Sequence, residues 1–405
     1  MRAPAVLRPF LPTAPLTGDD KWMIFLLWVT GVAMGWSQGE PSSLVPFTRA
    51  DLGVTQGGMS LILAIARFAA FFAVFVGALA DRIGRRRPLI GSLALLLVAT
   101  GLSALAPDPV TYGAAQALAR VGAAATSALA VVAMAEGVSP PVRAYAISFF
   151  GAAASLGSGI SVMTLPLAES ASWRLPHGLP AVLVVVLPFL WRRLPESPLL
   201  GEDLVVLPRI ELFRGEWARR LALVGAIGLL SSAFTAVGLA FTTERLIGDL
   251  GYPATTTILV TVGGGTLGGL GFFVGGRLAD AWGRRPTSIL ALSLALAGGL
   301  GLYAVTDLWM LWLAAFASSF GAFAYIPSGG AHRSELFPTS LRGYANTAAN
   351  YFATVGSALG LLFGSVTIDR LGLFDTLALL GVGLLVATVL TALLPETLGT
   401  SLDDV

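Results

Sequence analysis

The chain has 405 residues, of which 55% are hydrophobic and 12% are charged, with a mean hydropathy of +0.80. Soluble domains carry about 25% charged residues, so this composition excludes an ordinary soluble protein and places the chain in a lipid bilayer. The net charge of +2 is too small to indicate a nucleic-acid-binding surface. The absence of cysteine excludes disulfides and thiolate metal sites. We expect no metal and no cofactor.

Residues 1–20 contain four prolines and no signal-peptide pattern, which predicts a cytosolic N-terminal tail. From residue 21 onward, apolar runs long enough to span about 30 Å of hydrocarbon follow one another. They predict twelve transmembrane helices in two sets of six, near residues 21–47, 56–80, 88–106, 110–136, 143–168 and 176–194, and near residues 218–246, 255–279, 286–304, 308–335, 342–367 and 373–394.

We therefore expect an all-α membrane protein built from two six-helix bundles related by pseudo-symmetry. The expected segments are the N-terminal tail (1–20), the first bundle (21–195), a cytoplasmic linker (196–217), the second bundle (218–395) and a C-terminal tail (396–405).

Three short patterns occur twice at nearly one spacing. Gly-x-Leu-Ala-Asp-x-x-Gly-Arg-Arg starts at Gly77 and again at Gly276, an offset of 199 residues (276 − 77). A Glu…Arg-x-Tyr-Ala pattern repeats at the same offset, and Leu-Pro-Glu-Ser/Thr repeats 200 residues apart, at residues 194–197 and 394–397. A constant spacing of this kind indicates a duplicated half, and parallel repeats are a transporter architecture.

Basic residues fix the expected orientation. Most of the 25 lysines and arginines fall on the side of the predicted helices that also holds the two termini. Loops rich in these residues stay in the cytoplasm. We therefore expect a multi-pass protein of the inner (plasma) membrane with both termini cytoplasmic, a monomer surrounded by lipid.

Two six-helix halves with this doubled Gly-to-Arg motif resemble the major facilitator superfamily, over nearly the whole chain beyond residue 20. Arg120 in the fourth helix, the Glu…Arg pattern after it and the Pro-Glu-Ser/Thr segments resemble the sugar-porter and metabolite:proton symporter branches. Sugar porters carry paired glutamines in helix seven, and residues 222–232 have none. The proline of drug antiporters is missing from helix five.

The resemblance implies a latch that holds the cytoplasmic side shut while the outside is open. A carboxylate at a helix end pairs readily with a nearby guanidinium or with a helix N-terminus. Simple topology and turn chemistry are the alternative role. The candidate latch residues are Gly77, Asp81, Arg85, Glu136 and Arg143 in the first half and Gly276, Asp280, Arg284, Glu335 and Arg342 in the second.

Three charges fall at membrane depth, where ionisable groups are costly and so are functional candidates. Glu40 and Arg120 are the candidate proton-coupling pair, since the resembled branches pair an acid of helix one with the arginine of helix four. Those families place the acid directly after a Gly-aromatic pair, where this chain has Ser37. Arg67 is a candidate solute ligand or a structural cation, and an excess buried cation favours an anionic solute.

Polar side chains of the predicted helices complete the candidate solute site. Each of them can hydrogen-bond a solute or a neighbouring helix. Tyr325 lies beside Pro327, which predicts a break in helix ten. His177 is expected at the outer face. The candidate solute ligands are Arg67, Arg120, Gln116, Ser231, Thr235, Tyr325, Asn346 and Asn350.

These patterns predict a secondary active transporter that moves a small organic solute together with protons by alternating access. The sequence contains no phosphate-binding Gly-x-x-x-x-Gly-Lys-Ser/Thr loop, so ATP is not the expected energy source. The alternatives are a proton-coupled drug or metabolite efflux antiporter, a sugar transporter, and a membrane sensor that does not transport. An enzyme is not expected, because no nucleophile–base cluster falls at membrane depth.

Overall fold

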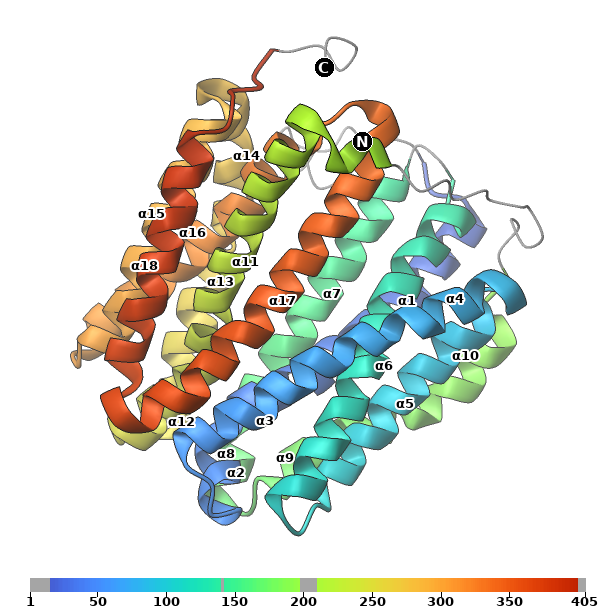
Figure 1. Ribbon diagram of the computed structural model, residues 1–405. Coiled ribbons are helices and arrows are strands. Elements are labelled where there is room, and N and C mark those ends of the chain that lie inside the picture. Colours follow the sequence, from blue (N-terminus) through green and yellow to red (C-terminus); the bar gives the residue numbers. More distant parts are fainter. Residues whose placement is uncertain (1–14, 140–141, 197–209, 400–405) are drawn as a thin grey trace, which may run out of the picture. The chain divides into compact units, whose positions relative to one another are not determined.

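The computed structural model describes residues 15–139, 142–196 and 210–399 (Figure 1). These residues form helices joined by short turns, and no strand occurs among them. In hydrocarbon, every backbone N–H and C=O group needs a partner within the chain, and a helix supplies that partner locally. Large apolar side chains such as Phe75 and Leu239 are exposed, as lipid-facing residues are.

In the described part of the chain, eleven helical stretches are long and apolar enough to cross a membrane. Five of them precede the predicted linker. They are formed by α3 (Gln56–Ala69) with the 3-10 turn η2 (Ala70–Phe72) and α4 (Ala73–Ile83); α5 (Arg86–Ala104); α6 (Pro109–Gly137); α7 (Arg143–Met163) with α8 (Leu165–Ser170); and α9 (Arg174–Gly178) with η4 (Leu179–Val186) and α10 (Leu187–Arg193).

The other six follow a 3-10 turn, η5 (Ile210–Phe213). They are formed by α11 (Gly215–Thr243) with the π-helical η6 (Glu244–Asp249); α12 (Ala254–Ile258) with η7 (Leu259–Gly263), α13 (Gly264–Gly268) and α14 (Leu270–Trp282); α15 (Arg284–Ala304); α16 (Leu308–Glu335); α17 (Thr339–Leu371); and α18 (Leu373–Ala392).

The first predicted helix and the predicted break in helix ten both need revision. The helix α1 (Gly18–Ser43) has 26 residues but is not among the eleven apolar spans. It ends earlier than expected, and a short helix, α2 (Val45–Asp51), follows with Pro46 in its first turn. The expected break at Pro327 was wrong, because α16 is helical through this proline.

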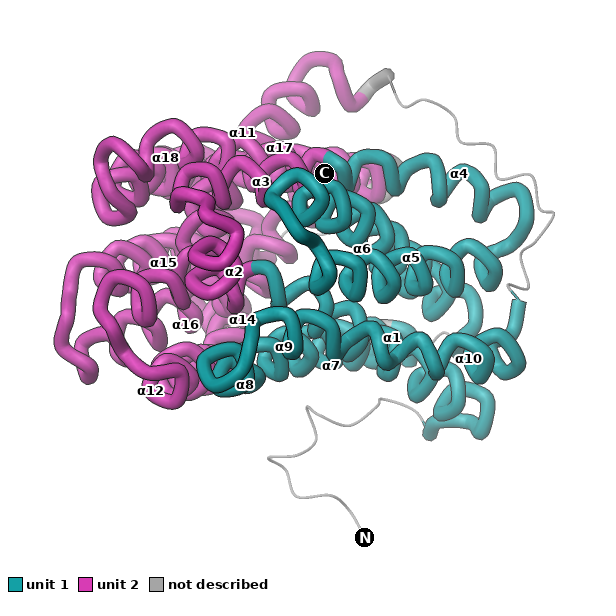
Figure 2. Tube along the Cα trace, turned by 90° about the horizontal axis from the view of Figure 1, so that it is seen from below, with its two compact units in different colours: residues 1–41, 69–204 teal, residues 42–68, 205–405 magenta. Residues whose placement is uncertain are grey.

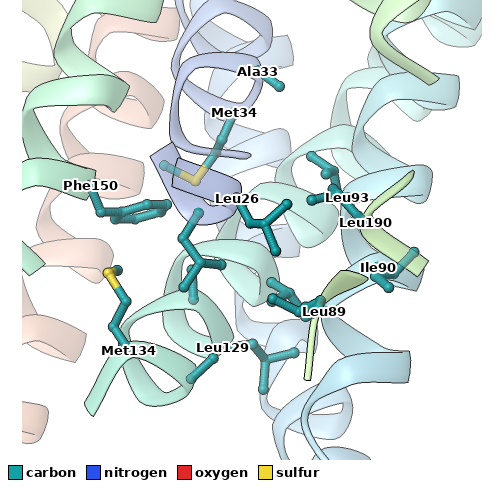
Figure 3. Packing of buried hydrophobic residues seen from close by; sticks show 14 of the residues in the cluster. Leu26, Ala33, Met34, Leu89, Ile90, Leu93, Leu129, Met134, Phe150 and Leu190 are labelled. Carbon is teal, nitrogen blue, oxygen red and sulfur yellow. The ribbon is translucent and has the colours of Figure 1, made fainter. Parts of the chain in front are cut away.

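The described helices belong to two compact units, coloured separately in Figure 2. Unit 1 comprises residues 1–41 and 69–204, and unit 2 comprises residues 42–68 and 205–405. The core of unit 1 is a buried cluster of apolar side chains from α1, α5, α6, α7 and α10 (Figure 3). Leu26, Leu93, Leu129, Phe150 and Leu190 are among them.

In unit 2, α11 packs along α17 and α15 packs along α16. Glycine permits these close approaches. A Cβ atom at Gly356 would lie 2.0 Å from the carbonyl oxygen of Leu229, and one at Gly321 would lie 2.4 Å from the amide nitrogen of Ala295. Small residues at such contacts allow helix backbones to touch, and this contact drives helix association in lipid.

The duplication also appears in how two helices begin. Asp108 caps α6 by accepting hydrogen bonds from the amides of Val110 and Thr111 at 2.9 and 3.0 Å. Asp307, 199 residues later (307 − 108), caps α16 in the same way through the amides of Trp309 and Met310. A side-chain cap satisfies backbone donors that have no partner in the first helical turn. The same local chemistry therefore starts the fourth helix of each repeat.

Candidate functional site

Glu40 is fully buried in unit 1, near the end of α1. Its Oε1 accepts a 2.6 Å hydrogen bond from the indole Nε1–H of Trp36, one turn earlier on the same helix. The hydroxyl of Thr164 lies 3.4 Å from the same oxygen. Oε2 has no hydrogen-bond partner within the described residues. The carboxylate therefore accepts from neutral donors through Oε1 alone, and its Oε2 makes no hydrogen bond to the described residues.

Arg120 lies in the middle of α6, also in unit 1. Its Nη1 donates a 2.6 Å hydrogen bond to Oε1 of Gln38 on α1. Residues two apart on an α-helix point about 200° apart, so Gln38 and Glu40 face opposite sides of α1. Within the described residues, Glu40 and Arg120 are not joined by an ion pair. The membrane depth of Glu40 stays a prediction, and the sequence did not show on which face of α1 the acid lies.

Gln116 lies one helical turn before Arg120, and its buried side chain contacts polar groups of neighbouring helices. Its Nε2 lies 3.0 Å from the hydroxyl of Ser103 and 3.0 Å from Nε2 of His177. His177, which the sequence predicts on the outer side of the membrane, is fully buried against the rings of Tyr112 and Trp173. This contact joins α6 to α5 and α9. In this state, Gln116 has a packing role.

Arg67 lies in α3, in the part of this helix that belongs to unit 2. The side chain is half-buried. Within the described residues, its guanidinium has neither a hydrogen bond nor an ion pair. A half-buried cation without a protein partner is well suited to bind an anion. Arg67 is thus the candidate solute ligand whose charge is most available.

The neutral candidates in unit 2 divide into engaged and available groups. The hydroxyls of Ser231 and Thr235 donate to backbone carbonyls of their own helix, at 2.6 and 2.9 Å. Asn346 accepts a 2.8 Å hydrogen bond from Nε of Arg333. Asn350 is exposed, and the ring of Tyr325 covers Gly329 one turn further along α16. Tyr325 and Asn350 therefore have free polar groups in the described part of unit 2.

The first copy of the charged motif forms a connected cluster inside unit 1. Arg85 pairs with Asp81 on the preceding turn, and its Nη2 lies 3.5 Å from Oε1 of Glu136. Glu196 accepts a 3.1 Å hydrogen bond from the backbone N–H of Arg86, at the start of α5. Gly84, with φ of 93°, leaves the space for that carboxylate. The Pro-Glu-Ser segment thus caps the helix that follows the motif.

The second copy repeats this cluster inside unit 2. Arg284 pairs with Asp280, and its Nη2 lies 3.2 Å from Oε1 of Glu335. Glu396 takes the place of Glu196 at the start of α15, beside Gly283 with φ of 117°. Burial raises the pKa of Glu396, but four backbone N–H groups donate to its carboxylate and hold the pKa below its usual value.

The remaining latch candidates contact backbone or open space. Nε of Arg143 donates to the carbonyl of Val138 at 3.2 Å, and Nε of Arg342 donates to the carbonyl of Ser334 at 2.8 Å. A Cβ atom at Gly77 would meet nothing within 4 Å, and one at Gly276 would lie 3.8 Å from Pro327. Within the described residues of unit 1, the expected close helix crossing at Gly77 is therefore not observed.

Sequence reasoning missed the residues that hold these charges in place. Trp36, Gln38 and Thr164 were not singled out, although Trp36 lies one helical turn from Glu40 and Gln38 two residues from it. Glu244, the fully buried acid of η6, and its partner Arg49 were also missed. Glu244 is at a helix end, where an acid in the sequence is expected to be solvated.

Comparisons with known proteins agree with this architecture. The family model described as "Major Facilitator Superfamily" matches residues 27–263 and 223–401. The chain is similar to the "Probable 4-methylmuconolactone transporter" of Cupriavidus pinatubonensis, with 27% identity over 88% of this chain and 85% of that protein. It is also similar to the "Chloramphenicol resistance protein" of Streptomyces lividans, with 31% identity over 92% of this chain and 98% of that protein.

Solved structures show the same fold. The structure described as a D-xylose-proton symporter has a TM-score of 0.75 at 19% identity, over 95% of this chain and 100% of that one. Together with the family match, this likeness indicates a multi-pass membrane transport protein and not an enzyme.

Proposed function

Since the chain belongs to the major facilitator superfamily, we propose that it is a proton-coupled symporter of a small organic solute, with an organic anion as the expected class. Glu40 carries the proposal: it is a fully buried carboxylate with neutral hydrogen-bond donors and one unpartnered oxygen. A charge in this environment is costly. A group of this kind can take up and release a proton as the transporter changes state.

Two arginines support an anionic solute. The guanidinium of Arg67 has no partner in the described part of the chain, and Arg120 donates to the neutral acceptor Gln38. A carboxylate solute would supply charge-assisted hydrogen bonds to the guanidinium of Arg67. The similarity to a protein described as a muconolactone transporter supports a small organic metabolite as the cargo.

The proposal includes the topology. The helix α1 is long enough at 26 residues to be the twelfth membrane span, and its lower hydropathy follows from the polar residues around Glu40. Twelve spans place both termini on one side. We infer that this side is the cytoplasm and that the membrane is the inner membrane, and the arginine-rich ends of the predicted helices support this orientation.

Similarity to a chloramphenicol resistance protein favours a second candidate, the efflux of a hydrophobic drug in exchange for protons. The two functions differ in the direction of solute movement. With a more acidic exterior, a symporter concentrates its solute inside a vesicle, whereas an antiporter expels it.

The test starts with a thermal-shift screen of organic acids, sugars and cationic drugs on the detergent-purified protein, because a ligand that binds the native state raises its unfolding temperature. The best ligand is then measured as labelled solute in proteoliposomes under an imposed pH gradient. Accumulation of an organic acid toward the alkaline side is expected. Expulsion of a cationic drug would establish the antiporter, and binding without any flux would contradict both candidates.

A further inference from the structure

Residues 42–68 belong to the first repeat by sequence but to unit 2 by their contacts. They contain the end of α1, the short helix α2 and most of α3. The rest of the same predicted membrane span, from Ala69 onward, belongs to unit 1. This segment, called the strap below, is therefore the part of the first repeat that the helices of the second repeat hold.

One attachment of the strap is an ion pair between a half-buried arginine and a fully buried acid. Nη2 of Arg49 lies 2.7 Å from Oε1 of Glu244, and Nε of Arg49 lies 3.0 Å from the same oxygen. The side-chain amide of Gln56 donates to this oxygen at 2.9 Å. Glu244 has an exposed fraction of 0%, and its carboxylate lies close against Gly248. Removing one partner of a buried ion pair is costly, because the other charge is left uncompensated.

A second attachment uses the carboxylate of Asp369, near the end of α17. Oδ2 accepts a 2.6 Å hydrogen bond from the hydroxyl of Thr55, and Oδ1 accepts a 2.9 Å hydrogen bond from the backbone N–H of Gly57. One turn further along α3, the hydroxyl of Ser60 donates to the carbonyl of Leu361 at 2.6 Å. Two acids of unit 2 thus hold the first turn of α3 and the helix before it.

The repeat has no second copy of this arrangement. Going back 199 residues from Glu244 and Asp369 leads to Val45 (244 − 199) and Ser170 (369 − 199). Going forward 199 residues from Arg49 and Gln56 leads to Gly248 (49 + 199) and Thr255 (56 + 199). No charge remains at these four positions at an offset of 199, although the 200-residue offset of the Leu-Pro-Glu repeat sets Asp369 against Glu169 (369 − 200). The position that matches Glu244 is apolar at either offset, Val45 or Leu44, so the Arg49–Glu244 ion pair has no counterpart in the repeat.

We propose that Glu244 and Asp369 are the acids of a one-sided clamp that closes the outer face of the transporter. The clamped residues lie where α1, α11 and α17 end, which is the outer face in the proposed topology. Outward opening then requires the strap to leave Glu244 and Asp369. The inference rests on the proposed function, because that function supplies the membrane topology. The clamp itself is tested separately, through the accessibility of single residues to a labelling reagent.

The chain has no cysteine, so one introduced thiol reports on this step without background. Ala64 in α3 is buried with an exposed fraction of 1%. In right-side-out vesicles, Ala64→Cys should react slowly with a membrane-impermeant maleimide. Adding Glu244→Gln and Asp369→Asn should speed this reaction about tenfold, because the closed state loses its clamp. Asp375→Asn, an exposed acid on α18, is the matched control and should change nothing.

A second reporter separates opening of the outer face from loosening of the protein. Asn350→Cys, exposed on α17 in this structure, is labelled from the cytoplasmic side in inside-out vesicles. Loss of the clamp should slow its labelling while labelling at Ala64→Cys accelerates. An unchanged rate at Ala64→Cys, or faster labelling at both positions, would overturn the clamp. Neither assay needs a solute or a proton gradient, so failure of the proposed symport leaves this test intact.

Discussion

The guanidinium of Arg120 donates a 2.6 Å hydrogen bond to Oε1 of Gln38. Glu40, two residues further along α1, instead accepts from Trp36 at 2.6 Å. The neutral amide holds the arginine on one face of α1, and the acid lies on the other face. The candidate solute ligand and the candidate proton carrier are therefore separate groups in this state.

Replacing Gln38 by Ala should weaken the site around Arg120. A hydrogen bond to a charged group is worth about 1.5–3 kcal/mol, so we expect a lower unfolding temperature in detergent and weaker binding of the solute. The matched control is Ser37→Ala. The hydroxyl of Ser37 is buried without a partner among the described residues, and its loss should be neutral or stabilising. Equal destabilisation by the two substitutions would show that the Gln38–Arg120 contact has no special role.

The sequence singled out Glu40 and Arg120, because ionisable residues in an apolar run are rare and costly; Glu40 is fully buried and Arg120 half-buried. It could not show that they have different partners. Depth along a helix follows from counting residues, but the facing side of Glu40 depends on how α1 is rotated against α6 and α7. The contact of Glu40 with Thr164, directly after α7, reports that rotation, whereas Trp36 lies on α1 itself.

Asp81 should affect transport more than stability. Its side chain is 68% exposed, and the pair with Arg85 is a surface ion pair worth less than about 1 kcal/mol. If the motif is a latch, Asp81→Asn should slow net transport and favour inward-open states while the unfolding temperature barely changes. Asp19→Asn, another exposed acid near a cytoplasmic helix end, is the control. Wild-type flux in Asp81→Asn would leave the motif with a topological role alone.

Gly283 should not tolerate a side chain. Its φ of 117° is unfavourable for other residues, and a Cβ atom would lie 2.6 Å from Oε2 of Glu396. We expect Gly283→Ala to cost about 1–3 kcal/mol, measured as a lower unfolding temperature. Gly77→Ala is the control, because a Cβ atom there meets nothing within 4 Å. A stable Gly283→Ala protein would contradict the placement of the Glu396 cap.

A disulfide should lock the strap to α17. A Cβ atom at position 364 would lie 2.8 Å from the hydroxyl oxygen of Ser60, which suits a disulfide between Ser60→Cys and Gly364→Cys. Oxidation of this double variant should stop transport, and a reductant should restore it. Each single variant should be insensitive to the oxidant. Full transport by the cross-linked protein would mean that the strap does not need to leave α17.

The assignment of the strap to unit 2 could not be read from the sequence. The repeat and the apolar run of residues 56–80 place these residues in the first bundle, and covalent continuity supports that placement. Their contacts with Glu244 and Asp369 depend on the conformational state, which no residue pattern encodes. The ion pairs of the doubled motif, in contrast, can be predicted from the sequence. Asp81 and Arg85 are four residues apart, as are Asp280 and Arg284, and side chains at this spacing meet on a helix.

The most direct test of the central claim is transport by Glu40→Gln in proteoliposomes, with the solute identified by the thermal-shift screen. Glutamine mimics a protonated glutamate and cannot release a proton. Accumulation driven by an imposed pH gradient should therefore be lost, whereas exchange of labelled for unlabelled solute should continue, since exchange needs no proton cycle. Arg120→Ala should lose both activities. If Glu40→Gln still concentrates the solute when a pH gradient is the only driving force, then Glu40 is not the proton carrier.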